Sequence, residues 1–286
     1  MFPKLKIHQT LLAPPLFWLL IFFIIPMAIV IGYSFGLGGV SSGASSGFTL
    51  QFYKQALSGM YLGIFLKSFG YAVGATVLTM AVAYPIAYYM AFASDRTKMI
   101  IMFLIILPFW TNFLIRMYSI MTILGDNGLV NNVLMQIGII HEPLKLINNS
   151  FGMYVGFVYW NLPFMILPIF SSLDRMDVSM LEASLDLGAN HRQTFMKITL
   201  PYSIPGAVAG IIFTFIPTLG NFIIPEFLGG TGNTMIGNVI TSQYLQARNW
   251  PFGSALSTVL MFIVMIFISL YIRYFDPTKS KNMVNF

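Results

Sequence analysis

Residues 182–206 read EASLDLGANHRQTFMKITLPYSIPG, and this polar stretch decides how the rest of the chain is organised. It gathers acids, bases and hydroxyls around a glycine, in a protein whose residues are 57% hydrophobic and only 8% charged. That apolar fraction exceeds what a soluble core needs, so the long uncharged runs around the stretch are typical of membrane helices and disfavour a soluble enzyme. The stretch itself is expected to lie outside the bilayer, as a connection between spans.

Apolar windows of about 20 residues, the length that crosses ~30 Å of hydrocarbon, predict the membrane spans. The predicted spans lie near residues 11–36, 62–92, 99–124, 150–173, 203–228 and 253–275. The first is interpreted as a retained span and not as a signal peptide, because its apolar run is long and no small-residue cleavage site follows it. The predicted fold class is an all-α integral membrane protein with about six transmembrane helices, in which residues 1–286 form a single domain.

The distribution of lysines and arginines sets the predicted orientation of these spans. Most of them fall before the first span, in alternate connections and after the last span: Lys4, Lys6, Arg96, Lys98, Arg175, Arg192, Lys197, Arg273, Lys279 and Lys281. The positive-inside rule therefore predicts that both termini and residues 174–201 are cytoplasmic. This orientation explains the net charge of +6 better than nucleic-acid binding does.

The remaining connections suggest little chemistry. Residues 36–47 are a run of glycine and serine that predicts a flexible external loop, and residues 49–57 predict a short interfacial helix after it. The chain has no cysteine, its three histidines are scattered, and it has no phosphate-binding loop of the GxxxxGK[ST] type. We therefore expect no catalysis by this chain, no metal site and no bound cofactor.

Local signals in the quoted stretch and just before it predict a helix, a glycine turn and a second helix. Ser179 and Glu182 fit a capping box, with Asp177 as an alternative cap, and the first helix is expected to end at Gly188 in the left-handed conformation. A second cap, formed by Asn190 with Gln193, is expected to open a helix that Pro201 stops.

The apolar residues of this segment leave two interpretations open. Leu181, Leu185, Phe195 and Met196 are expected to form apolar patches beside charges. Such a surface fits either a docking site for another protein or an amphipathic loop that lies on the lipid, and spacing alone does not choose between them.

The stretch resembles the EAA signature of permease subunits of type I ABC importers. That signature has E-A-A, a glycine four residues later and an I-x-L-P ending. The matching residues are Glu182, Ala183, Gly188, Ile198, Leu200 and Pro201, and Ser184 stands where the family usually has alanine. A membrane sensor or scaffold that only borrows the fold is the competing hypothesis, but it has no need of such a segment.

The resemblance implies a fold, a location and a set of partners. Residues 174–201 would be the coupling helix that seats in a cleft of a separate ATPase subunit, which carries the ATP and Mg, and Glu182 would contact that subunit. Two ATPase copies, a second permease subunit forming a heterodimer and an extracytoplasmic binding protein would complete an importer in the inner, or cytoplasmic, membrane of a bacterial cell.

A narrower resemblance concerns the substrate. The segments PFWTNFLIRMY at 108–118, IGNVI at 236–240 and NWPFGSALS at 249–257 are similar to bacterial spermidine and putrescine permeases. This similarity implies a polyamine substrate. Importers of ferric ion, sulfate, phosphonate or thiamine are the alternative, and Arg116 keeps an anionic substrate open.

One acid falls inside a predicted span, and an intramembrane acid is a functional candidate by default. Glu226 lies near the external end of the fifth span. Arg116 counts to a similar depth, about 17 residues or ~26 Å from the cytoplasmic end of its span. Glu226 is therefore expected either to contact a cationic substrate or to pair with Arg116, and both roles could coexist.

Further candidates for the substrate pathway are polar or aromatic residues in the outer parts of the spans. They are Trp110, Asn112, Tyr118, Tyr159, Trp160, Asn161 and Asn221. An aromatic belt at the membrane interface is the ordinary explanation for each single ring. Pro163, Pro168 and Pro217 strengthen the group, because kinked helices with freed carbonyls are tolerated mainly where protein or water satisfies them.

Overall fold

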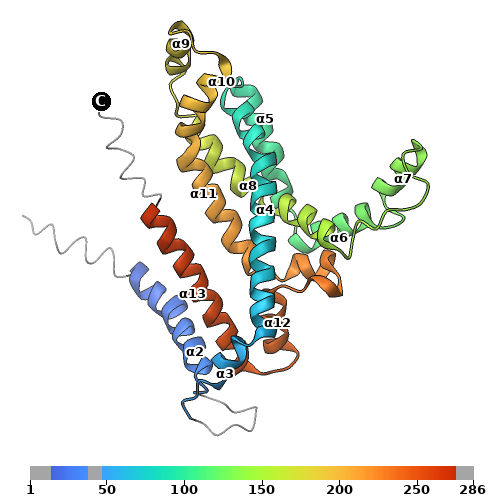
Figure 1. Cartoon of the computed structure of the whole chain (residues 1–286), viewed down its shortest axis with the longest axis vertical. Helices are drawn as coiled ribbons and strands as arrows, with labels where there is room; N and C mark the ends of the chain where they lie inside the picture. The colour runs from blue at the N-terminus through green and yellow to red at the C-terminus, as the bar shows by residue number, and fades with distance from the viewer. Residues whose placement is uncertain (1–13, 38–46, 275–286) are drawn as a thin grey trace, which may run out of the picture. The chain divides into compact units, whose positions relative to one another are not determined.

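The computed structural model describes residues 14–37 and 47–274, and every regular element in these ranges is a helix (Figure 1). The helices long and apolar enough to cross a membrane are Pro14–Ser34, Gly59–Ala91, Ser150–Leu173, His191–Leu219 and Trp250–Tyr271. The all-α fold with about six spans is therefore confirmed: these five helices are joined by a bent pair, Asp95–Trp110 with Phe113–Gln136, which makes a sixth span if it crosses as one. Residues 38–46 of the predicted loop, and the predicted charges at Lys4, Lys6, Lys279 and Lys281, lie outside the described residues, so the orientation stays a prediction.

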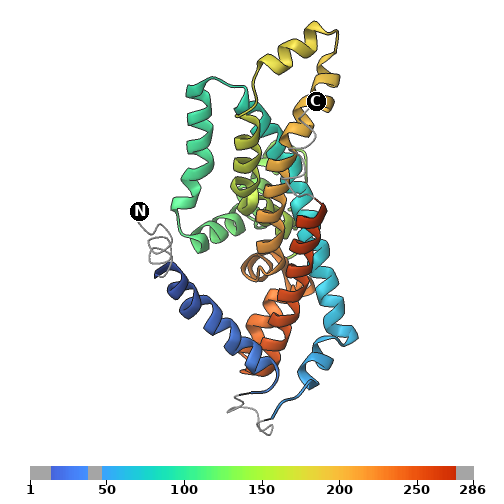
Figure 2. The same cartoon turned by 90° about the vertical axis from the view of Figure 1, so that its left-hand side faces the viewer.

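The predicted third span, 99–124, is wrong as a single straight helix. The chain forms α5 (Asp95–Ile106), the short 3₁₀ turn η2 (Leu107–Trp110), α6 (Phe113–Leu124) and α7 (Leu129–Gln136). The axis turns by 101° between the two halves. The bend is visible in the green helices of Figure 2. Pro108 favours the tight turn, and the Asn112 side chain accepts a hydrogen bond from Leu114 N–H that starts a new helix.

The predicted fifth span, 203–228, differs at both ends. One helix runs from His191 to Leu219 as α10 (His191–Thr194), the π-helical turn η3 (Phe195–Thr199) and α11 (Leu200–Leu219). The expectation that Pro201 stops a helix is therefore wrong. The Leu200 N–H bonds to the Phe195 carbonyl, and this wider turn gives the backbone the room that a proline ring takes from an ordinary helix.

After α11 the chain makes two short turns. They are η4 (Pro225–Gly229) and the 3₁₀ turn η5 (Thr231–Asn233), which precede α12 (Ile236–Leu245). Glu226 therefore lies in a separate turn and not in the long helix. Asn149 N–H donates to the Leu228 carbonyl at 3.2 Å, which ties this turn to the start of α8 (Ser150–Leu173).

The chain divides into two compact units. The first comprises Met1–Gly63 and Val239–Ser269. Its described part contains the N-terminal helix, with the π-helical turn η1 (Leu20–Ile24) and α2 (Ile25–Ser34), then α3 (Gln51–Ala56) and most of α13 (Trp250–Tyr274). The helix predicted at 49–57 is thus confirmed. Ring contacts hold this unit, among them Tyr61 with Phe252, whose centroids lie 5.0 Å apart.

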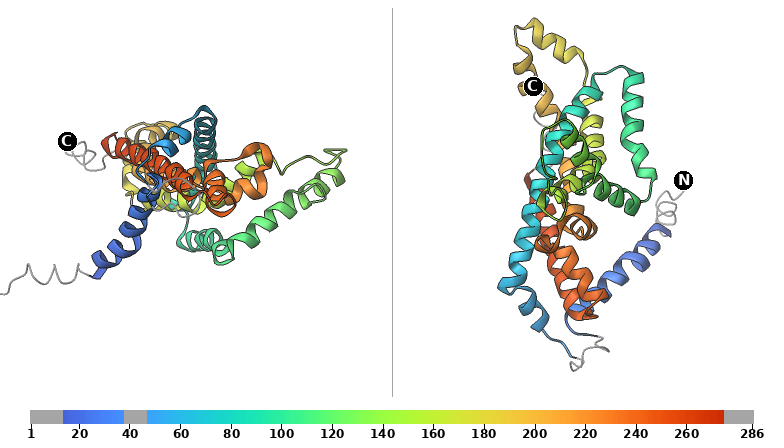
Figure 3. Two further views of the ribbon diagram at one scale, coloured as in Figure 1. Left: turned by 90° about the horizontal axis from the view of Figure 1, so that it is seen from below. Right: turned by 90° about the vertical axis from the view of Figure 1, so that its right-hand side faces the viewer.

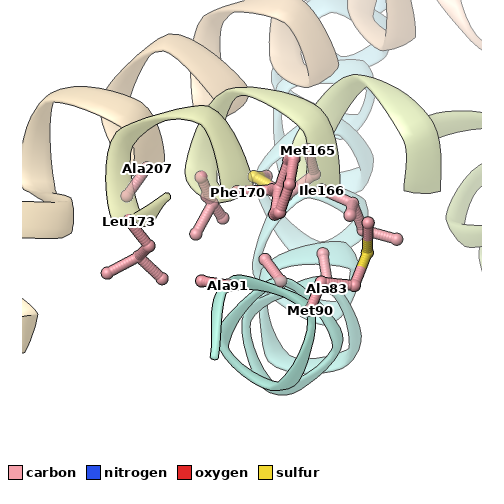
Figure 4. Close-up of a cluster of buried hydrophobic side chains, with 10 residues drawn as sticks. Ala83, Met90, Ala91, Met165, Ile166, Phe170, Leu173 and Ala207 are labelled. Carbon is pink, nitrogen blue, oxygen red and sulfur yellow. The ribbon is translucent and has the colours of Figure 1, made fainter. Parts of the chain in front are cut away.

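The second unit comprises Ile64–Asn238 and Leu270–Phe286 and contains the candidate site. Most of the long helix α4 (Gly59–Ala91) lies in this unit, and alanines near its C-terminal end share a buried cluster with α8 (Figure 4). Ala83, Ala87 and Ala91 are buried there against larger side chains of α8 such as Met165 and Phe170. Larger side chains of α8 therefore fill the space that the small alanine side chains leave between the two helices.

The contact between α8 and α11 depends on glycines. A Cβ atom placed on Gly206 would clash with the Pro168 carbonyl oxygen and would lie 2.7 Å from Ser172 Cβ and 3.0 Å from Ile169 Cα. One at Gly210 would lie 2.7 Å from Met165 Sδ. These two helices therefore pack backbone against backbone, which fixes the direction in which the polar segment between them leaves.

Candidate functional site

The polar segment begins with α9 (Ser179–Asp186), which lies beyond the ends of α8 and α11 (Figures 1 and 3). The predicted capping box of Ser179 with Glu182 is wrong, because the cap position is Val178 and it makes no side-chain hydrogen bond. The Asp177 carboxylate, one residue before that cap position, accepts the Ser179 N–H at 2.9 Å, so Asp177 supplies the side-chain hydrogen bond that Val178 does not make. Hydrogen bonds from the backbone and then the side chain of Ser179 lower the pKa of Asp177, so its charged form is lost only when the pH falls through that lowered value.

Gly188 ends α9 as predicted. Its φ is +84°, in the left-handed region. Its N–H donates to the Leu185 carbonyl at 2.9 Å, and the Ala189 N–H donates to the Ser184 carbonyl at 3.1 Å. These two bonds form a Schellman motif, so the turn is specified locally.

The second predicted cap is also confirmed. The Asn190 side chain accepts the Gln193 N–H at 2.9 Å, and the Gln193 side chain accepts the Asn190 N–H at 2.9 Å. This capping box opens α10, so the helix, glycine turn and helix are all present.

A buried pair of hydroxyls joins α9 to α10. Ser184 Oγ lies 2.8 Å from Thr194 Oγ1 and donates to the Leu181 carbonyl at 2.8 Å. Both residues are buried, with exposed fractions of 8% and 7%. Sequence reasoning missed Thr194, whose only signal is a second small hydroxyl residue facing the glycine turn.

We expect Ser184→Ala to loosen this segment by about 1–3 kcal/mol, because it leaves the Thr194 hydroxyl buried without its partner. Hydrogen exchange of the α9 amides would rise. The double variant Ser184→Ala/Thr194→Val should recover most of the protection, since both polar groups are then removed. Equal exchange rates in Ser184→Ala and the parent protein would contradict the role of the pair.

The expected apolar patch needs one correction. Phe195 does not face outward, because it packs against α4 with ring centroids 6.0 Å from Tyr84 and 5.7 Å from Tyr88. Leu181 is half-buried. The exposed apolar side chains of the segment are Val178, Met180, Leu185, Leu187 and Met196.

Polar contacts anchor the base of the segment. Lys98 Nζ lies 2.6 Å from Asp174 Oδ1, which ties the start of α5 to the end of α8. The Tyr202 hydroxyl of α11 donates to the Arg175 carbonyl at 3.1 Å, and the Tyr202 carbonyl accepts from Ser172 Oγ at 3.0 Å. The segment is thus held by α5 and α11 at its base.

The residues of the signature are placed in two groups. Glu182, Ala183, Gly188 and Pro201 are exposed, whereas Ser184 is buried and Ile198 and Leu200 are half-buried. The exposed group lies where another protein could reach it. The buried group holds the shape of the segment.

The structure does not bring Arg116 and Glu226 together as a pair. Glu226 is exposed, and its Oε2 accepts from Asn238 Nδ2 at 3.1 Å. Arg116 is 7% exposed and is covered by aromatic rings. Within residues 14–37 and 47–274 the ion pair recorded is Lys98 with Asp174.

The aromatic candidates for the pathway differ in how much of each side chain is exposed. Trp110 is 78% exposed and Tyr118 is 58% exposed, whereas Tyr159 and Trp160 are half-buried. The Tyr118 ring contacts Phe227, beside Glu226, with centroids 5.2 Å apart. Tyr118 of α6 is therefore the aromatic candidate that lies next to the turn containing Glu226.

Three amide side chains play structural parts. Asn112 caps α6, and Asn221 accepts the Ile224 N–H at 3.0 Å, so both shape the backbone. Asn161 is fully buried and donates to Thr218 Oγ1 at 2.9 Å, which joins α8 to α11. Its Oδ1 has no hydrogen-bond partner in the part of the chain that the structure describes.

Apolar spans joined by an exposed polar helix, turn and helix define a multi-pass membrane protein with an exposed polar segment at one end. The chain belongs to the family of binding-protein-dependent transport system inner membrane components, whose family model matches residues 83–281. Known members are the parts of transport systems that lie in the membrane, as the family description states.

Relatives of known function share a large part of the chain. It is 41% identical over 184 residues to the spermidine/putrescine transport system permease protein PotB of Haemophilus influenzae, with 64% of each chain covered. It is 38% identical over 185 residues to PotB of Escherichia coli K12, covering 65% of this chain and 67% of that protein. The match thus spans somewhat less than two thirds of the H. influenzae relative.

A solved structure shares the fold. A bacterial ABC transporter involved in the import of the acidic polysaccharide alginate superposes with a TM-score of 0.72 at 17% identity, covering 94% of this chain and 96% of that one. At this identity the likeness concerns the fold alone.

Proposed function

We propose that this chain is the permease subunit of an ATP-driven importer of polyamines such as spermidine and putrescine. The observation that carries the proposal is the 38% to 41% identity with PotB permeases over about two thirds of the chain. The chain forms half of the translocation pathway. It carries no catalysis and binds no cofactor, because ATP and Mg belong to a separate ATPase subunit.

The proposed assembly lies in the cytoplasmic membrane of a bacterium. It contains a second permease subunit, two copies of the ATPase and an extracytoplasmic binding protein. The coupling segment, residues 174–201, meets the ATPase through the exposed face of α9, where Glu182 can form charge-assisted hydrogen bonds. Leu187, which is 88% exposed, would be covered by that partner.

The hydrogen bonds and ring contacts described above suit this segment to transmit movement. Closure of the ATPases displaces α9, and the Ser184–Thr194 pair passes the displacement to α10. Phe195 then engages α4 through Tyr84 and Tyr88. A shift at the surface therefore reaches two membrane helices and not α11 alone.

The charges of the pathway favour a cation over the anionic alternatives. The guanidinium of Arg116 is covered by rings and is not offered to an anion, whereas the carboxylate of Glu226 is exposed. Exposed rings at Trp110 and Tyr118 suit organic ammonium groups. The proposed pathway comprises Glu226, Trp110, Tyr118, Tyr159 and Trp160, with Asn112, Asn161 and Asn221 supporting its backbone.

Reconstitution tests this function. The chain is assembled with its partner subunits in proteoliposomes, and uptake of labelled spermidine and putrescine is measured with ATP inside and loaded binding protein outside. ATP-dependent accumulation of a polyamine is the expected result. Accumulation of sulfate or ferric ion, with none of either polyamine, would refute the proposed substrate.

Glu226→Gln should weaken apparent polyamine affinity in this assay by roughly tenfold, the equivalent of one lost charge interaction. Glutamine keeps an oxygen that can accept from Asn238, so the variant isolates the charge. Asn238→Asp is the companion variant, since it adds a negative charge next to Glu226. Unchanged affinity and rate in Glu226→Gln would remove Glu226 from the path.

A further inference from the structure

Arg116 is a buried cation that forms no ion pair with any acid among the described residues. Its side chain is 7% exposed, and its Nε and Nη1 atoms have no hydrogen-bond partner in the described part of the chain. The ion pair recorded in that part involves other residues. Arginine stays protonated in proteins, so the charge is permanent.

Aromatic rings take the place of an acid. The guanidinium carbon lies 4.6 Å from the centroid of Phe109, 5.0 Å from that of Trp160 and 5.9 Å from that of Phe113. We call these three rings the aromatic box. They come from η2, α6 and α8, and the Trp160 and Phe113 centroids are 4.5 Å apart.

This arrangement is expensive for a purely structural contact. Burying a charge costs free energy, and the attraction between the cation and the ring faces offsets only part of that cost. A methionine would fill the same space without it. An ionisable residue at membrane depth therefore calls for a function. Rings that surround a cation are also the ordinary recognition site for organic ammonium groups.

We propose that the aromatic box is an ammonium-binding subsite on the translocation path and that Arg116 is its resident cation. The guanidinium fills the box at rest, and an ammonium group of the substrate displaces it. The two cations exclude each other by repulsion, so the box accepts a cation only when Arg116 withdraws. This inference rests on the proposed function, because it takes the polyamine as the displacing ligand.

The position of the box supports passage from one ring site to the next. Trp110 directly follows Phe109 on η2 and is 78% exposed, and Tyr118 lies two residues beyond Arg116 and is 58% exposed. An arriving alkylammonium can therefore meet open rings before it reaches the filled box. The box selects for positive charge without a carboxylate of its own.

Equilibrium binding of putrescine to the purified full complex, without ATP or binding protein, tests the proposal. Arg116→Met should bind labelled putrescine at least about tenfold more tightly than the parent complex. Arg116→Lys should resemble the parent, because a cation still fills the box. Lys54→Met, which removes an exposed cation from α3, serves as the matched control and should change nothing.

A second substitution ties the gain to the rings. The gain in Arg116→Met should vanish in Arg116→Met/Trp160→Leu, and succinate, a dianion of the same chain length, should bind no better to any variant. A gain that survives the loss of Trp160, or no gain at all, would overturn the proposal. Arg116→Gln is the second variant if Arg116→Met assembles poorly, and failure of both neutral variants beside an intact Arg116→Lys would show a structural cation and overturn it as well.

The test of the aromatic box can fail or succeed independently of the test of the proposed function. Binding to the box needs neither ATP nor transport, whereas the proposed function stands on ATP-dependent uptake by the parent complex. Tight binding in Arg116→Met beside a parent complex that imports no polyamine would keep the box and reject the substrate. Normal polyamine import by the parent complex, without tighter putrescine binding in Arg116→Met, would keep the proposed substrate and reject the aromatic box as a binding subsite.

Discussion

Gly188→Val is expected to abolish ATP-driven uptake while the protein remains in the membrane. The φ of Gly188 is +84°, a conformation that costs an ordinary residue ~1–2 kcal/mol and a β-branched residue more. No atom lies within 4 Å of a Cβ built there, so the effect comes from the backbone and not from a clash. The turn would open, and α9 would leave the direction that the Schellman bonds give it.

The measurement is substrate uptake together with ATPase activity stimulated by the binding protein. Stimulation should fall roughly tenfold or more in Gly188→Val, in keeping with strain above 1.4 kcal/mol. Gly188→Asn is the matched control and should retain most activity, because asparagine tolerates the left-handed region. Glu182→Lys should uncouple the complex without any change in the turn. Full activity in Gly188→Val would count against the coupling role.

Gly206→Ala should destabilise the whole second unit. A single methyl group there meets the Pro168 carbonyl oxygen and Ile169 Cα, which are backbone atoms that cannot turn aside. The α8 and α11 helices must move apart, and overpacking of this kind costs about 1–3 kcal/mol. The free energy of unfolding, measured by denaturant titration in detergent, should fall by that amount.

Gly70→Ala provides the control for this prediction. Gly70 is also a helical glycine, in α4, but no atom lies within 4 Å of a Cβ built on it. Alanine should therefore be neutral or slightly stabilising there, because it forms helix more readily than glycine does. A similar loss of stability at both positions would mean that close packing at Gly206 is not the cause.

Features encoded within a few residues could be predicted from the sequence. Hydropathy predicted a helix at 150–173, which is where α8 lies. The turn at Gly188 and the capping box of Asn190 with Gln193 were predicted from short-range signals. Each of these depends on local hydrogen bonds or on composition. No tertiary information is needed for them.

The bend of the chain between α5 and α6 could not be predicted from such local signals. LPFW at 107–110 is as apolar as its surroundings, so a hydropathy window does not register the turn made there. The proposed pairing of Arg116 with Glu226 failed for this reason. Counting residues measures depth only along a straight helix, and the axis turns by 101° before Arg116.

Contacts between distant residues were equally out of reach. Thr194 seemed an ordinary helical residue, and Phe195 seemed free to dock, because neither the hydroxyl of Ser184 nor the rings of Tyr84 and Tyr88 can be located from spacing. The site was therefore predicted in its exposed parts and missed in the parts that support them.

The π-helical turn at Phe195–Thr199 has a consequence for the phase of the helix that contains it. A π turn accommodates one residue more than an α turn, and each residue of an α-helix advances the azimuth by about 100°. The helix α10 before the turn is therefore rotated by that angle relative to α11. A chain lacking one residue there would form a regular helix, and the segment that precedes it would point about a quarter turn away around the axis of α11.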